Sequence, residues 1–105
     1  MTKEEVEVKE IFNRYRKAIH VQKMIDEGYM YLLEENDIES YEELKKHHAR
    51  VELTNKVLRP ISKLFINNCF IKRNDDAWGC GIYSRSTFYR LRKEAVNEFL
   101  YYFNL

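Results

Sequence analysis

Residues 82–103, IYSRSTFYRLRKEAVNEFLYYF, decide the fold that we expect for this chain. The apolar side chains of the segment recur at helical spacing, and they are Phe88, Leu91, Ala95, Phe99 and Tyr102. Ser84 stands where an N-cap hydroxyl would begin such a helix. The spacing therefore predicts a long amphipathic helix that starts after Ser84, ends near Phe103 and buries its apolar stripe in a core.

The other side of this helix is polar and cationic. Its members are Arg85, Tyr89, Lys93 and Asn97 in a row at four-residue intervals, with Ser86 and Arg90 beside them. Residues 85–93 contain four cations and no carboxylate. A solvated face of a terminal helix is the alternative interpretation, although such faces usually mix both signs of charge. The major groove of DNA accommodates a helix, arginine can bridge guanine there, and lysine or hydroxyl groups hold phosphate. We interpret the segment as a recognition helix.

Length and composition favour a single helical domain. The 105 residues are 45% apolar and 14% aromatic, which suffices for a core. Only 3 Gly and 1 Pro are present, and so few chain-breakers favour long helices over a sheet with many turns. We predict an all-α fold of five or six helices, in which a helical extension precedes a small C-terminal helical unit.

The first half of the chain predicts a long helix followed by an apolar turn. Helical periodicity runs from about Lys3 to Glu27, and Gly28 is the expected stop. The stripe consists of Val8, Ile11, Phe12, Tyr15, Ala18, Ile19 and Ile25. Residues 29–33 form an apolar cluster that predicts either a brief helix or a packed turn, and residues 34–39 predict a loop.

A second helical stretch begins at Ser40, which together with Glu43 fits a capping box. Pro60 either kinks one long helix or occupies the first turn of a new one. We favour a break near Arg59, after which the apolar face continues to about Ile71.

A turn is predicted at residues 72–76, KRNDD, before a short helix through Trp78 and Cys80. Asp75 or Asp76 is expected to cap this helix, and Cys80 is expected to lie buried against Trp78. The final run, LYYFNL at residues 100–105, is too apolar for a free terminus. It is expected either to pack onto the N-terminal helices, which we favour, or to form part of a dimer interface.

Charge divides the chain into two unequal parts. Residues 1–55 contain 9 Lys/Arg and 13 Asp/Glu, whereas residues 56–105 contain 9 and 4, and the formal net charge is +1. This asymmetry favours contact with a polyanion at the C-terminal end only. We therefore divide the chain into an N-terminal region for dimerisation or partner binding, residues 1–59, and a DNA-binding region, residues 60–105.

About 40 residues at the C-terminus resemble a known kind of helix-turn-helix. Three pieces carry the resemblance: the apolar residues Leu64, Phe65, Ile66, Phe70 and Ile71, then Asp76 to Trp78, and finally YSRSTFYRLRKEAV at residues 83–96. They resemble region 4 of bacterial sigma factors and, more closely, the small RinA/ArpU-like late transcriptional regulators of phages. Because the stretch between Ile71 and Ser84 is short and contains two glycines, we expect a shortened first helix in the motif.

The resemblance implies binding of promoter DNA by the helix that starts at Arg85. The residues that it implies in contact with bases and phosphates are Arg85, Ser86, Thr87, Tyr89, Arg90 and Lys93. In the docking that we expect, Arg85 and Arg90 approach base edges, while Ser84, Lys72 and Arg73 join the phosphate contacts. The expected function is a sequence-specific DNA-binding transcriptional regulator with double-stranded DNA as partner. RNA polymerase is a further candidate partner, and the N-terminal helices are a candidate homodimer interface.

Other functional classes have less support from the sequence. A helical protein–protein interaction or adaptor protein without DNA binding is the main alternative, favoured by the near-neutral net charge and the acidic first half. We expect no enzyme, because no nucleophile elbow, Gly-rich phosphate loop or HExxH motif is present. We also expect no cofactor and no metal, because the spacing of His47, His48, Cys69 and Cys80 does not suit zinc. The lack of a signal peptide and of a long apolar run predicts a cytoplasmic protein without membrane contact.

Overall fold

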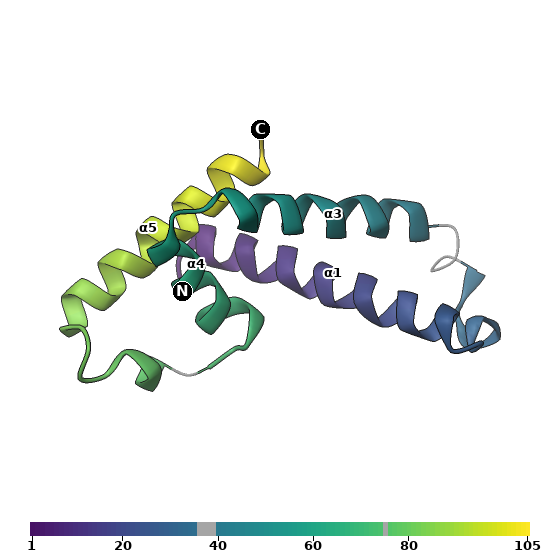
Figure 1. Cartoon of the computed structure of the whole chain (residues 1–105), viewed down its shortest axis with the longest axis horizontal. Coiled ribbons are helices and arrows are strands. Elements are labelled where there is room, and N and C mark those ends of the chain that lie inside the picture. The colour runs from purple at the N-terminus through teal and green to yellow at the C-terminus, as the bar shows by residue number, and fades with distance from the viewer. Residues whose placement is uncertain (36–39, 75) are drawn as a thin grey trace.

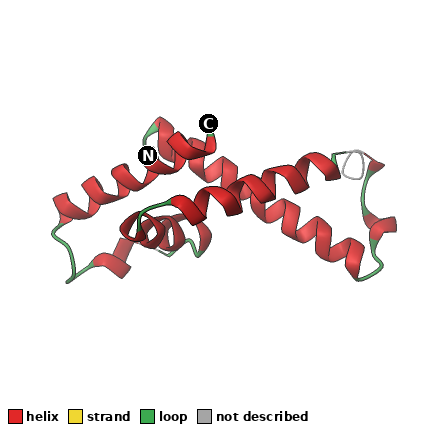
Figure 2. Ribbon diagram, turned by 45° about the horizontal axis from the view of Figure 1, so that its top comes forward, coloured by secondary structure: helices red, strands yellow, loops and turns green. Residues whose placement is uncertain are grey.

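The structure is a computed structural model that describes residues 1–35, 40–74 and 76–105. In these residues it contains α-helices and short helical turns but no strand, so the expected all-α class is confirmed (Figure 2). The four α-helices of the described ranges are α1 (Lys3–Asp26), α3 (Tyr41–Val57), α4 (Pro60–Ile66) and α5 (Arg85–Phe103).

Helices α1 and α3 form a long antiparallel pair, and α4 and α5 pack at one end of it (Figure 1). The molecule is accordingly elongated, with principal extents of 50 × 29 × 23 Å. Both chain termini lie at the end that holds α4 and α5. Among the described helices, none combines the length and the apolar character that a bilayer span needs.

Helix α1 stops at Gly28 as predicted. Gly28 has a φ of 84°, in the left-handed region that suits glycine at the end of a helix. Its N–H bonds to the carbonyl of Ile25, and the N–H of Tyr29 bonds to that of Met24, at 3.1 and 2.8 Å. These two bonds make a Schellman motif. The 3₁₀ turn η1 (Met30–Leu32) follows, and its side chains are largely exposed.

The second helical stretch breaks where Pro60 predicts. Helix α3 ends at Val57, and Pro60 is the first residue of α4. One detail of the sequence interpretation was wrong: Ser40 occupies the N-cap position of α3, but its side chain makes no capping hydrogen bond. Its ψ of 0° departs from the extended conformation that usually aims an N-cap hydroxyl at the first turn. The part of the expected loop at residues 36–39 lies outside the described residues.

Between α4 and α5 the chain forms two short irregular helices. A π-helical turn, η2 (Asn67–Ile71), extends α4, and a 3₁₀ turn, η3 (Asp76–Gly79), precedes α5. Asp75 and the side chain of Asp76 lie outside the described part of the chain, so the cap expected from one of them stays a prediction. The expected burial of Cys80 was wrong: Cys80 is exposed, and Trp78 instead packs against Phe65 and Phe88.

One apolar core joins both halves of the chain. Its buried members come from all four α-helices and from η2, and they include Val8, Phe12, Val51, Phe65, Phe70, Phe88, Val96, Phe99 and Phe103. A smaller cluster of Ala18, Val21 and Leu44 joins α1 to α3 farther from α5. Two stripe residues were assigned wrongly, because Ile19 and Tyr102 are exposed while their neighbours Ala18 and Phe103 are buried.

The C-terminal run packs within the chain, as expected. Leu100 and Phe103 are buried, and the ring of Phe103 stacks on Phe99 with 5.7 Å between centroids. His47 of α3 meets the same ring edge-on at 5.6 Å. Tyr101 and Leu105 are exposed, so the run presents one apolar side to the core and another to solvent.

Candidate nucleic-acid interface

An aromatic cluster fixes the start of α5. Phe88 packs against Phe65 and Trp78, with centroid distances of 5.3 and 5.4 Å. Gly79 lies directly against the Phe88 ring, and a Cβ at this position would stand 2.5 Å from a ring carbon. Gly79 therefore lets η3 approach α5 closely enough to hold its first turns.

Ser84 caps α5 as predicted. Its Oγ accepts a hydrogen bond from the N–H of Thr87 at 3.3 Å, and its hydroxyl donates to Oγ1 of Thr87 at 2.8 Å. The cap orients the first turn and uses the Ser84 hydroxyl as donor and acceptor, whereas Thr87 accepts at Oγ1 and keeps its own O–H as a donor. Ser84 therefore forms the helix start, and phosphate contact by Ser84 and Thr87 stays a prediction.

The cationic side of α5 is open to solvent. The exposed residues on it are Arg85, Ser86, Tyr89, Arg90, Lys93 and Asn97. The amino-terminal turn of α1 reaches only its flank, where Met1, Thr2 and Glu5 line a hollow together with Tyr89, Arg92 and Lys93. The start of α1 thus borders this face at Tyr89 and Lys93, while Arg85, Ser86 and Arg90 are exposed.

Two exposed arginines on this face have partners within α5. Arg90 makes an ion pair with Glu94, with 3.1 Å between Nη1 and Oε1. Arg85 lies over the ring of Tyr89, 5.9 Å from its centroid. Exposed pairs of this kind contribute at most about 1 kcal/mol, so an incoming phosphate or base can displace them.

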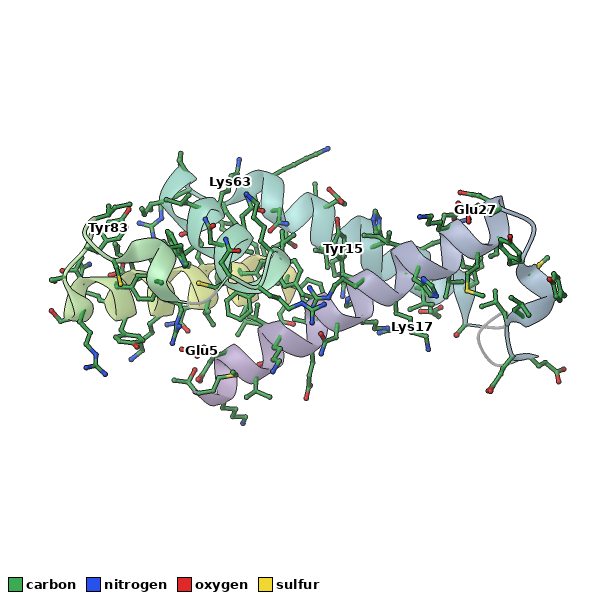
Figure 3. The ribbon with its side chains drawn as sticks, turned by 90° about the horizontal axis from the view of Figure 1, so that it is seen from below. Glu5, Tyr15, Lys17, Glu27, Lys63 and Tyr83 are labelled. Atoms are coloured by element: carbon green, nitrogen blue, oxygen red, sulfur yellow. The ribbon has the colours of Figure 1, made fainter. Side chains whose placement is uncertain are left out.

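Arg92 is withdrawn from the cationic face. Its guanidinium lies 3.6 Å from a carboxylate oxygen of Glu5 and 4.9 Å from the centroid of the Tyr89 ring. The side chain is only 19% exposed. Figure 3 shows Glu5 on the amino-terminal turn of α1, close to α5. From the sequence, we counted Arg92 among the four cations of residues 85–93 but did not place it on this face. Its contact with Glu5 was not predicted, because Glu5 is distant along the chain.

Lys72 and Arg73 are exposed but belong to a different neighbourhood. Arg73 has a φ of 54° and follows η2, which packs against α1. Burial, and then the charge of Arg73, lower the pKa of Arg16 on α1. Arg16 also donates a hydrogen bond to the carbonyl of Phe70 at 2.8 Å. Arg73 therefore lies near Arg16 of α1, while Asn74 of the same segment lines a hollow together with Arg92 of α5.

Where the resemblance leads us to expect the first helix of the motif, residues 76–79 form only the four-residue turn η3. A helix-turn-helix of the expected kind would have a longer helix before its recognition helix. The shortened helix expected from Gly79 and Gly81 is thus found, whereas likeness to sigma region 4 stays a prediction. No protein-family model, curated protein or solved structure matches the chain.

His47 and His48 of α3 both contact α1. Nε2 of His47 lies 2.9 Å from the carbonyl oxygen of Ile11, and the His48 ring stacks on Tyr15 at 4.7 Å. Within the described ranges, no group of three or more His, Cys, Asp or Glu side chains is arranged to hold a metal ion.

Proposed function

We propose that the chain binds double-stranded DNA through α5 and acts as a sequence-specific transcriptional regulator. The observation that carries this proposal is the solvent-exposed cationic face of α5. A helix of this kind fits the major groove when its other side is anchored in a core. Phe88 and Phe99 supply that anchor, since both are buried.

The exposed side chains suggest a division of roles. Arg85 and Arg90 have guanidinium forks that can bond O6 and N7 of guanine together. Ser86, Tyr89 and Lys93 are suited to phosphate, which fixes the register of the helix but carries no sequence information. Lys72 and Arg73, which are exposed on the segment after η2, are further candidate phosphate ligands. RNA polymerase contact and homodimer formation remain proposals for residues 1–59.

Titration of selected and random duplexes with matched variants tests the proposal. Arg90→Ala should cost about 1–3 kcal/mol on a selected site and relax its specificity, whereas Lys93→Ala should weaken all sequences alike and reduce the salt slope by about 1. Lys23→Ala, near the far end of α1, is the control and should change neither quantity. Unchanged affinity in both α5 variants would refute the proposed interface.

An adaptor function is the second candidate, favoured by exposed apolar side chains at the far end of the α1–α3 pair. These are Tyr29, Met30, Tyr31 and Leu32, of which Tyr31 is 77% exposed. Such a group of apolar side chains can serve as a protein contact. Weak binding to random duplex DNA without a steep salt dependence would favour this function over DNA binding.

A further inference from the structure

A polar cleft lies between α1 and α3, away from the predicted contact residues of α5. It has a volume of about 280 Å³ and is lined by Arg14, Glu43, Lys46, His47 and Arg50. Three of these side chains are cations and one is a carboxylate. The cleft is therefore a positively charged site in the half of the chain whose overall charge is negative.

Most of this positive charge is not neutralised by neighbours. Lys46 pairs with Glu43 at 3.7 Å. Arg14 and Arg50 make no ion pair with a carboxylate in the described ranges of the chain. Two guanidinium groups thus line the cleft, and neither makes an ion pair with a carboxylate of the described residues. Guanidinium forks match the oxygens of phosphate.

The walls of the cleft are held in place by packing. The His47 ring bonds to the carbonyl of Ile11 and thereby ties α3 to α1. The Arg50 guanidinium lies 5.5 Å from the centroid of the Phe103 ring on α5. Because Phe103 is buried, Arg50 rests on a fixed surface, and a ligand would need to order fewer side chains on binding.

We propose that this cleft binds a phosphate group between Arg14 and Arg50. The two uncompensated cations match the charge of a phosphate dianion, whereas a carboxylate would balance only one of them. The group can belong to free phosphate, to a small phosphate ester or to a nucleic-acid backbone, since all present the same oxygens. The proposal does not depend on DNA binding by α5.

Nuclear magnetic resonance titration of the full chain with inorganic phosphate provides the test. Burial lowers the pKa of His47, and the charges of Arg14, Arg50 and His48 lower it further, against the backbone hydrogen bond to Ile11. Bound phosphate should therefore raise the pKa of His47 and shift its ring resonances saturably. Chloride at equal ionic strength should do neither.

Two variants and one control locate the site. Arg14→Gln and Arg50→Gln should each weaken phosphate binding about fivefold, the equivalent of roughly 1 kcal/mol. Arg14 is exposed and lies outside the apolar core, so its variant stays informative if Arg50→Gln disturbs packing on Phe103. Lys45→Gln, on the neighbouring position of α3, should bind phosphate normally. Equal responses to phosphate and chloride, or unchanged binding in Arg14→Gln, would overturn the proposal.

A second arm identifies the source of the phosphate. If the cleft holds a DNA phosphate, Arg14→Gln should reduce the salt slope of duplex binding by about 1. If it holds free phosphate or a small ester, the slope should stay unchanged while phosphate binding is lost, which also supports the site. If the chain does not bind DNA at all, the titration with inorganic phosphate still tests the cleft, because it does not involve DNA.

Discussion

The carboxylate of Glu98 on α5 accepts a hydrogen bond from the backbone N–H of Arg59, at 3.1 Å, in the break before α4. Nε of Arg59 donates to the other oxygen at 3.2 Å, and the hydroxyl of Ser62 donates to that same oxygen. The hydrogen-bond acceptor at the start of α4 is thus a side chain of another helix, α5. One side chain both caps α4 and joins it to α5, whose opposite side carries the candidate interface.

Glu98→Gln should destabilise the fold. The amide keeps the shape of the carboxylate but loses its charge and can accept at only one oxygen. Removing charge-assisted hydrogen bonds from a mostly buried site costs about 1–3 kcal/mol. Chemical denaturation followed by circular dichroism measures the change. Glu94→Gln is the control, because Glu94 is exposed and pairs only within α5, and it should cost much less.

The contribution of Glu98 should also depend on pH. Burial raises the pKa of Glu98, but hydrogen bonds from Ser62 and Arg59 outweigh it and hold the pKa below the ordinary 4.5. A depressed folded pKa gives stability that is present above the unfolded pKa and lost as pH falls through the folded value. The stability difference between the wild type and Glu98→Gln should therefore shrink on acidification below about 4.5. A constant difference over that range would contradict the assignment.

Gly79→Ala should loosen the start of α5. The added Cβ would stand 2.5 Å from Cδ2 of Phe88, so the ring or η3 must move. Overpacking of this kind costs about 1–3 kcal/mol. Thermal unfolding measures the loss, and Ala77→Ser is a control on the exposed side of the same turn. Wild-type stability in Gly79→Ala would show that the turn is free to shift.

The features that neighbours along the chain determine were predictable from the sequence. Pro60 begins a helix, Gly28 ends one and Ser84 caps one because each acts through its own backbone or the next turn. The exposed side of α5 follows in the same way from helical periodicity. The open surface of Arg90 and Lys93 was therefore predictable from spacing alone.

The failures concern features that tertiary packing determines. Cys80 was expected beside Trp78, yet Trp78 turns toward Phe65 and leaves the thiol exposed. The withdrawal of Arg92 required knowing that the first turn of α1 meets α5. The cleft at Arg14 and Arg50 was missed for the same reason, because its two arginines come from different helices. The composition of that half of the chain predicted a negative charge there, opposite to the positive charge of the cleft.

Tyr15→Phe tests the link between α1 and α3. The Tyr15 hydroxyl donates a hydrogen bond to Glu52, and Figure 3 shows Tyr15 beside α3. Burial, the hydrogen bond and the charge of Glu52 raise the pKa of Tyr15 to about 12 from 10.0. A raised folded pKa gives stability that is present below the unfolded pKa and lost as pH rises through the folded value.

The wild type should therefore lose part of its stability between about pH 10 and 12, and Tyr15→Phe should lose less there. At neutral pH the variant should be less stable by about 0.5–1.5 kcal/mol, the contribution of a typical hydrogen bond. Absorption of the tyrosinate ion should show one late-ionising tyrosine that disappears in Tyr15→Phe. Tyr101→Phe, at an exposed position on α5, should leave that late ionisation in place.

Glu94→Gln should strengthen DNA binding if α5 is the interface. The substitution removes a negative charge beside the duplex and releases Arg90 from its ion pair at 3.1 Å. An exposed pair of this kind contributes about 0.5–1 kcal/mol, which corresponds to a two- to fivefold gain in affinity. Fluorescence anisotropy with a labelled duplex measures it. The double variant Arg90→Ala with Glu94→Gln should lose most of this gain in affinity, because it has no Arg90 to be released from the ion pair. An equal gain in the double variant would assign the effect to net charge, and no gain in either would place the duplex elsewhere on the protein.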